Sequence, residues 1–350
     1  MQSVTYFLPG EVRLTRAQIP VPGDGEVLLK VLLAGMCTTD RHIVQGHFTV
    51  PSPRILGHEL AGVVQATGPG VSPDWTGKTC GVMPARFCGT CSMCRQGQPQ
   101  LCQNFECLGN THDGGFAGYT IVRVEQLVPL DGLPLLDAVW LEPLACVLQA
   151  LEQLGGRDTP DPVLVSGAGV LGRLMVQVLA AWGKQVAVVD PNPDRVDAAQ
   201  AMGAQAGWVV PRTGPVSDIA SALQAWAGGS IAALIDTTGQ PVSIERLLDW
   251  AGPRARVLLF GVSSPSAHIT ISPQKLFTRE LTILASSGMT PASFTAAYTL
   301  LCSCQLDLSA LSAPPVSLEE LPDYLLGKRS PNGLKVIVSP DSAGQDQPHD

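Results

Sequence analysis

The stretch Val163-Leu-Val-Ser-Gly-Ala-Gly-Val-Leu-Gly172 decides the fold of this chain. An apolar strand runs into Gly167, Gly169 and Gly172, and an apolar segment of helical period follows. In a strand–turn–helix unit of this kind, one glycine makes the tight turn, one lets a pyrophosphate approach the backbone, and one lets the helix pack on the strand. The stretch therefore predicts a dinucleotide site on a parallel sheet.

The pattern of residues around this stretch predicts two domains. From about residue 135, Ala- and Leu-rich segments of helical period alternate with short apolar strands, which is typical of a parallel, doubly wound sheet. Residues 1–125 instead alternate short aliphatic runs with Gly/Pro turns, as in a β-rich domain. After about residue 285 the pattern is irregular, and it ends in the strand Leu334-Lys-Val-Ile-Val338. The simplest arrangement is an α/β protein whose tail returns to the first domain.

The residues after the glycine turn indicate which dinucleotide is bound. Val170 and Leu171 open the helix, and its N-terminus faces the phosphates. Asp190 ends the second strand, eighteen residues past Gly172, where a carboxylate can accept both ribose hydroxyls and repel a 2′-phosphate. This placement favours NAD over NADP, unless Asp190 is only the N-cap of the next helix.

Two further segments carry candidate contacts with the cofactor. Arg195 lies five residues past Asp190, where it can lie along the adenine or remain a solvated helix residue. Gly261 and Val262, which follow the predicted strand Val257-Leu-Leu-Phe260, complete the predicted cofactor contacts.

Four cysteines within fifteen residues predict a structural metal lobe at about residues 86–104. Three have Cys-x2-Cys-x2-Cys spacing, and the fourth follows after a gap of seven residues. Four thiolates fill a zinc tetrahedron and leave no open position for a substrate. An iron–sulfur cluster begins with the same spacing but continues with Cys-x3-Cys-Pro, so the spacing disfavours it. The predicted ligands are Cys88, Cys91, Cys94 and Cys102.

Composition argues against several functional classes. The chain has 350 residues, 45% of them hydrophobic, and a formal net charge of −8. Without a basic block, nucleic-acid binding has no electrostatic support. The sequence shows neither a run of about 18 apolar residues nor a leader pattern, so we expect a soluble cytoplasmic protein, and metal-type thiols agree with a reducing compartment. The polar end from Pro340 to Asp350 is expected to fray.

A second set of metal-ligand residues is spread over three segments. Cys37 begins the run Cys-Thr-Thr-Asp-Arg-His, His58 and Glu59 precede a predicted strand, and Glu142 opens a helix into the second domain. Taken singly, these are a buried thiol, a core histidine and a helix-start carboxylate. Together with a nucleotide fold, a thiolate, an imidazole and a carboxylate give zinc three protein ligands and an open fourth position, which is the pattern of a catalytic site.

At these residues the chain resembles the medium-chain, zinc-dependent alcohol dehydrogenase family, and within it the polyol and threonine dehydrogenase branch. The resemblance rests on Cys-Thr-Thr-Asp-Arg-His, Gly-His-Glu, the four-cysteine lobe and Glu-Pro, and it covers almost the whole chain. It implies a GroES-like catalytic domain, at 1–146 and 282–350, that encloses an NAD-binding Rossmann domain at 147–281.

The resemblance also implies roles for the metal-ligand residues. Positions matching Cys37 and His58 bind a catalytic zinc in that family. Positions matching Glu59 and Glu142 share the carboxylate role, one as a ligand and one directly or through water. Two zinc ions per chain are therefore expected, one reactive and one structural.

Proton transfer and cofactor binding are implied in the same way. Positions matching Thr39 and His42 form a proton relay, and those matching Asp190 and Arg195 hold the adenosine ribose. The expected activity is hydride transfer between a secondary alcohol or polyol and NAD, in a homodimer or homotetramer. The segment Leu284-Ala-Ser-Ser-Gly288 lacks the arginine found near this point in polyol and threonine dehydrogenases, so the substrate itself is not implied. A non-catalytic NAD-binding sensor is the alternative, and the complete relay argues against it.

Overall fold

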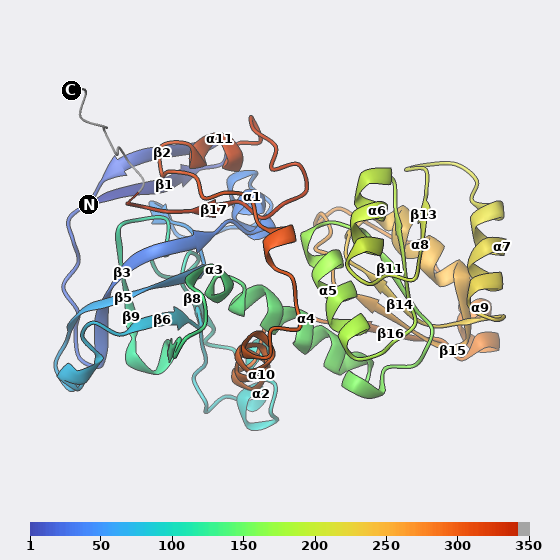
Figure 1. Cartoon of the computed structure of the whole chain (residues 1–350), viewed down its shortest axis with the longest axis horizontal. Coiled ribbons are helices and arrows are strands. Elements are labelled where there is room, and N and C mark those ends of the chain that lie inside the picture. Colours follow the sequence, from blue (N-terminus) through green and yellow to red (C-terminus); the bar gives the residue numbers. More distant parts are fainter. Residues whose placement is uncertain (342–350) are drawn as a thin grey trace. The chain divides into compact units, whose positions relative to one another are not determined.

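The computed structural model describes residues 1–341 and divides the chain into two compact units (Figure 1). Unit 1 comprises Met1–Ala145, Met289–Cys302 and the described chain from Leu308 onward. Unit 2 comprises Cys146–Gly288 and Ser303–Asp307. Most of the terminal segment that we expected to fray, residues 342–350, lies outside the described residues.

A parallel sheet of six strands forms the centre of unit 2. Its strand order is β13-β12-β11-β14-β15-β16, so the chain proceeds outward from β11 in both directions. Ligands bind at the carboxyl edge of such a sheet, at the point where the order reverses. The strands are β11 (Val163–Ser166), β12 (Val186–Asp190), β13 (Ala206–Val209), β14 (Ile231–Asp236), β15 (Ala251–Leu259) and β16 (Thr282–Ala285).

Helices connect these strands and cover the sheet. α5 and α6 pack against β11, β12 and β13, whereas α8 and α9 pack against β14 and β15 (Figure 1). Because both faces are covered, the Val-rich strands β11 and β12 are buried along their whole length. The helices are α4 (Leu141–Leu154, which begins in unit 1), α5 (Val170–Ala181), α6 (Pro193–Ala201), α7 (Ser217–Trp226), α8 (Pro241–Trp250) and α9 (Pro273–Arg279).

Unit 1 is built mainly from antiparallel strands. Its largest sheet has the order β10-β6-β5-β3-β17, with β9 also paired to β3, and two small sheets contain β2-β1-β4 and β7-β8. The strands are β1 (Gln2–Leu8), β2 (Glu11–Arg16), β3 (Glu26–Gly35), β4 (Arg54–Ile55), β5 (Glu59–Thr67), β6 (Thr79–Val82), β7 (Ala85–Arg86), β8 (Glu106–Cys107), β9 (Tyr119–Arg123), β10 (Leu127–Pro129) and β17 (Ile337–Val338).

Helices in unit 1 are mostly short. They are α1 (Thr38–Val44), α2 (Ser92–Arg95), α3 (Leu135–Ala138), α10 (Pro291–Cys302) and α11 (Leu321–Leu325). The short 3-10 helices are η1 (Pro73–Trp75), η2 (Pro99–Leu101), η3 (Val124–Gln126), η4 (Gly156–Asp158, in unit 2) and η5 (Ser309–Leu311). Within residues 1–341, no helix combines the length and the hydropathy needed to cross a bilayer.

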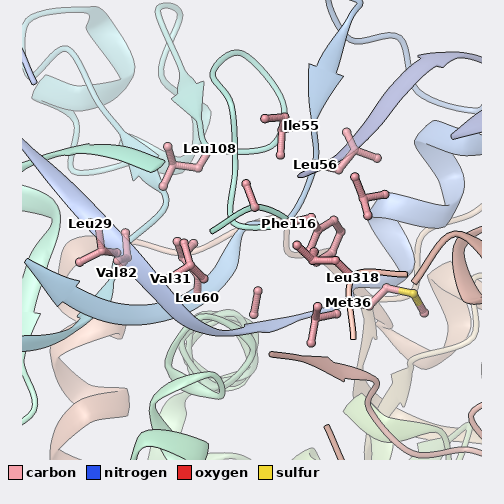
Figure 2. Close-up of a cluster of buried hydrophobic side chains, with 14 of the residues drawn as sticks. Leu29, Val31, Met36, Ile55, Leu56, Leu60, Val82, Leu108, Phe116 and Leu318 are labelled. Carbon is pink, nitrogen blue, oxygen red and sulfur yellow. The ribbon is translucent and has the colours of Figure 1, made fainter. Parts of the chain in front are cut away.

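Aliphatic side chains from β3 and β5 form the core of unit 1 together with the end of the chain. Figure 2 shows Leu29, Val31 and Leu60 along these strands, and Phe116 close to Leu318. Leu318 precedes α11, so residues from the C-terminal part complete the core of the N-terminal part. The pairing of β17 with β3 fixes this return of the chain.

Two details differ from the sequence-based expectations. The expected boundary at 281/282 assigned β16 to the catalytic domain, whereas β16 pairs with β15 and extends the parallel sheet of unit 2. The predicted strand Leu334–Val338 is regular only at Ile337–Val338, because Lys335 instead forms an isolated bridge with Ser312.

Candidate functional site

The register of β3 and β5 places three potential metal ligands together in unit 1. Gly35, at the end of β3, pairs with Glu59 at the start of β5. Cys37 follows β3 by two residues, and His58 immediately precedes β5. A side chain at position 35 would block this arrangement, since its Cβ would lie 2.2 Å from Glu59 Oε2.

The donor atoms of Cys37, His58 and Glu59 all lie within 4.8 Å of one another. Zinc–ligand bonds of about 2.0–2.3 Å bring donors within about 4 Å of each other, so this group fits a zinc ion. His58 and Glu59 are buried and Cys37 is half-buried. Three protein donors of this kind are typical of catalytic zinc, which keeps one position for water or substrate.

Asp40 orients this group, although the sequence analysis gave it no role. Its carboxylate accepts hydrogen bonds from the backbone N–H of Cys37 (2.9 Å) and of Gly57 (3.2 Å), and one oxygen lies 3.6 Å from His58 Nδ1. Burial raises the pKa of Asp40. Burial would lower the pKa of His58, but the neighbouring Asp40 and Cys37 outweigh it and raise that pKa well above its usual value. Asp40 therefore ties both segments of the metal group together.

Lys335 is a second participant that the sequence analysis missed. Its Nζ donates to Glu59 Oε2 (2.5 Å) and lies 5.2 Å from the ring centroid of Trp140. Both ends of this ion pair are buried, Lys335 at 5% and Glu59 at 2% exposed. Burial would lower the pKa of Lys335, but the Glu59 carboxylate outweighs it, so the pKa is raised and the lysine is charged at neutral pH.

Glu142, the other predicted carboxylate, lies in the first turn of α4 and acts on the same group electrostatically. Burial and closer partners have the larger effects on the pKa values of His58 and Lys335, and the negative charge of Glu142 raises both pKa values further. Among the described residues, it is not one of the donors that converge within 4.8 Å. Glu59 is therefore the carboxylate nearer to Cys37 and His58.

The predicted relay residues lie on α1. Thr39 and His42 are three positions apart and so share a face of this helix. The Nδ1 atom of His42 is buried and has no hydrogen-bond partner within residues 1–341. Burial lowers the pKa of His42, and the nearby His47 and Arg41 lower it further. His42 is therefore neutral at pH 7 and can accept a proton.

The four lobe cysteines converge as predicted. Their sulfur atoms lie within 4.8 Å of one another, with Cys88 and Cys102 at 3.5 Å and Cys91 and Cys102 at 3.9 Å. Tetrahedral zinc with bonds of about 2.3 Å separates its sulfurs by about 3.8 Å, so the spacing fits. Backbone N–H groups point at these sulfurs, and they lower the pKa of Cys88 to about 5. Backbone hydrogen bonds also lower the pKa of Cys91, whereas burial raises the pKa of the Cys94 thiol to about 12.

The glycine turn in unit 2 has the geometry that a pyrophosphate site requires. Gly167 has φ +98°, which makes the turn, and a Cβ on Gly172 would lie 1.8 Å from the Gly167 carbonyl oxygen, so helix and strand touch there. A Cβ on Gly169 would meet nothing within 4 Å, which leaves its backbone open to a ligand. Val170 and Leu171 begin α5 directly beyond.

Asp190 holds the same turn. Its carboxylate accepts from the backbone N–H of Ala168 (2.7 Å) and of Asn192 (2.9 Å). The alternative that Asp190 caps the next helix is wrong, because Asn192 is the N-cap of α6 and accepts from the N–H of Arg195 (3.3 Å). Asp190 lies at the carboxyl end of β12, and half-buried Arg195 lies in the first turn of α6.

A polar loop after β14 supports the glycine turn and was not foreseen. Buried Asp236 accepts from the Thr238 hydroxyl (2.7 Å) and the Gly239 N–H (2.8 Å). The Thr237 hydroxyl donates to the Gly167 carbonyl (3.1 Å), which fixes the turn from the neighbouring strand. The run Asp-Thr-Thr-Gly after an apolar strand was the available signal.

Gly261 and Val262 lie beside this polar loop. A Cβ on Gly261 would lie 2.2 Å from the Gly239 nitrogen, so the two loops touch backbone to backbone. Val262 is 49% exposed. Both residues follow the carboxyl end of β15, and parallel strands place these ends on one edge of the sheet. The predicted cofactor residues of unit 2 therefore share that edge.

Comparisons with known proteins identify two matching domain families. Residues 23–132 match the alcohol dehydrogenase GroES-like domain, and residues 170–303 match the zinc-binding dehydrogenase model. Starvation-sensing protein RspB of Escherichia coli K12 is 32% identical over 82% of this chain and 83% of its own length. D-altritol 5-dehydrogenase of Agrobacterium fabrum is 31% identical over 83% of this chain and 84% of its own.

Solved structures share the whole fold. RspB from E. coli CFT073, complexed with NADH, has a TM-score of 0.88 and 29% identity, over 97% of this chain and 99% of that one. A zinc-binding dehydrogenase from Sinorhizobium meliloti bound to NADP also has a TM-score of 0.88, with 28% identity over 97% and 99% of the two chains.

The chain belongs to the zinc-binding dehydrogenases of the medium-chain alcohol dehydrogenase family. The resemblance that its motifs carry is therefore confirmed, and so is the α/β fold with GroES-like and Rossmann parts. Its class is that of an oxidoreductase, in agreement with the metal group in unit 1 and the glycine turn in unit 2.

Proposed function

We propose that this protein oxidises the secondary hydroxyl of a polyol or related sugar alcohol with NAD, and reduces the corresponding ketone in reverse. The observation that carries the proposal is the group of Cys37, His58 and Glu59, whose three donors leave a fourth zinc position for substrate. A closed four-thiolate site alone would stabilise a fold but would do no chemistry.

Cys37, His58 and Glu59 would hold the reactive zinc, with Glu142 nearby as the second carboxylate. When bound, zinc lowers the pKa of a hydroxyl by many units, as it does for water from about 16 to about 7. Asp40 and Lys335 set the charge and orientation of the ligands, because they pair with His58 and Glu59.

The substrate proton would pass from the Thr39 hydroxyl to His42. Thr39 lies two residues from Cys37 and shares a helix face with His42. A histidine with a lowered pKa is neutral near pH 7, so it accepts a proton from the hydroxyl and later releases it. Proton removal from the substrate then needs no free hydroxide.

The glycine turn would bind the cofactor through Gly167, Gly169, Gly172 and the start of α5. Helix N-termini favour phosphate through free N–H groups and the helix dipole. When bound, nicotinamide accepts the hydride that the carbinol carbon releases. Asp190 and Arg195 would hold the adenosine ribose at the end of β12.

A screen of secondary alcohols, polyols, amino alcohols and cyclitols tests the function. We expect NAD-dependent turnover with at least one polyol, measured as NADH formation at 340 nm, because relatives include D-altritol 5-dehydrogenase. NADH binding without turnover on any of these compounds, in protein loaded with zinc, would contradict the proposal and favour the sensor.

Asp190 should determine the preference for NAD. Its carboxylate repels a 2′-phosphate, so wild-type kcat/KM is expected to favour NAD over NADP. Asp190→Ser removes that charge and should lower the ratio of kcat/KM with NAD to kcat/KM with NADP by about tenfold or more, corresponding to about 1.4 kcal/mol or more. Asn192→Ser, at the cap of α6, is the control and should leave the ratio unchanged. Equal use of both cofactors by the wild type would contradict this role of Asp190.

We further propose a homo-oligomer in a reducing compartment such as the cytoplasm. Four cysteines lie within fifteen residues, and such clusters of metal-type thiolates persist only where disulfides do not form. The oligomer is supported by the family resemblance alone, and sedimentation velocity measures it directly.

A further inference from the structure

The His42 side chain lies beside a second histidine, His47, which the proposed relay does not include. Their ring centroids are 5.3 Å apart with the planes at 57°. At this separation, the nearest ring nitrogens can approach to about 3 Å, or be joined by one water, which is the range for proton transfer. His47 is exposed, whereas His42 is half-buried.

A relaying imidazole uses both of its nitrogens, one to accept and one to release the proton. The Nδ1 atom of His42 is buried, so it cannot release a proton directly to bulk water. Phe48 lies on the same ring, at 5.8 Å between centroids, and restricts solvent further. An exposed proton-accepting group beside His42 would therefore shorten the path of the proton from His42 to bulk water.

The backbone after α1 holds His47 in this position. Gly46 has φ +79°, which turns the chain, and the His47 N–H donates to the His42 carbonyl (2.8 Å). The turn thus places the His47 ring beside the His42 ring, where His47 remains exposed to solvent.

Other charged groups near α1 are already paired or repel a proton. Arg41 lowers the pKa of His42, after burial and His47. The helix packed on α1 is α11, and its Asp323 lies 3.7 Å from Lys328 and 3.8 Å from Arg329. Among the described residues, His47 is therefore the imidazole beside His42 that can receive its proton.

We propose that His47 is the outer proton-transfer residue of this enzyme, carrying to solvent the proton that Thr39 and His42 take from the substrate hydroxyl. The O–H bond of the substrate breaks, the proton moves through both imidazoles, and it leaves to water or buffer while the hydride goes to NAD. This inference rests on the proposed function.

Single-turnover proton release, followed with an indicator dye beside NADH formation, tests the proposal. In wild type we expect both signals to appear together. In His47→Gln, proton release in dilute buffer should lag by about tenfold, below the 10²–10⁴-fold typical of a complete acid–base group, and added imidazole should restore it. His112→Gln, another exposed histidine, is the control and should match wild type. His47→Gln with unchanged proton release, or a lag that imidazole does not restore, would overturn the inference.

Two further results separate failure of this inference from failure of the proposed function. His42→Ala should slow turnover itself, by about 10²-fold or less, because the inner step is lost. The pKa of His42, measured by NMR without substrate, should rise in His47→Gln, because a positive neighbour is removed. An unchanged pKa of His42 in His47→Gln would overturn the proposed coupling of the two histidines, whether or not the wild type turns over an alcohol. Absence of turnover in the wild type would contradict only the proposed function.

Discussion

Cys37→Ser should leave one zinc per chain and reduce kcat/KM by about 10³-fold or more, since a Lewis acid contributes several kcal/mol to such a transition state. The four-thiolate group is separate in sequence and retains its ion. Atomic absorption or mass spectrometry of the native protein measures the metal, and NADH formation measures the rate. The reactive and structural roles are thereby assigned to different ions.

Matched cysteine variants sharpen this experiment. Cys302→Ser changes an exposed thiol outside both groups and should keep both ions and full activity. Cys91→Ser should lose the other ion and lower stability, because a structural zinc contributes about 10–16 kcal/mol of apparent binding free energy. If Cys37→Ser loses both zinc ions, or keeps full activity with a single zinc ion, the assignment of one reactive and one structural zinc is wrong.

Lys335→Met should destabilise the protein by about 3 kcal/mol, near the lower end for a broken buried ion pair. Glu59 would remain buried without its lysine partner, and a zinc ion held by Glu59 would compensate in part for the lost positive charge. Chemical denaturation of the zinc-loaded protein measures the change. The affinity for zinc should also fall, because removing a residue that hydrogen-bonds to a metal ligand typically lowers metal affinity by about 10–100-fold.

Two comparisons isolate the ion pair from the loss of packing. Lys328→Met removes an exposed partner of Asp323 and should change stability little. In zinc-free protein, where Glu59 holds no metal, the double variant Glu59→Gln/Lys335→Met removes both charges and should recover most of the stability lost in Lys335→Met, since a neutral pair needs no counter-ion. A single variant as stable as wild type would contradict the importance of this buried contact.

The nucleotide site was largely predictable because its chemistry depends on local backbone geometry. Gly167, Gly169 and Gly172 follow one strand within ten residues, and each has the space or the φ angle that its place in the motif implied. The loop of Asp236 was harder to foresee, because its hydrogen bonds to the glycine turn join strands that are adjacent only in the folded sheet.

The metal group was predictable in its donors but not in their partners. Cys37, His58 and Glu59 have side chains that bind zinc, and those types can be read directly from the sequence. Asp40 lies inside the same motif, yet its function depends on a hydrogen bond to Gly57 that only folding creates. Lys335 gave no signal, because one lysine near a chain end is usually solvated.

The distance along the chain between Glu59 and Lys335 has a consequence for synthesis. These residues are 276 positions apart, and the segment between them includes all of unit 2. While the chain is still on the ribosome, β3 and β5 can already be made, but β17 and its lysine are absent. The nascent catalytic part therefore lacks the cation that pairs with Glu59 until the segment carrying Lys335 has been made.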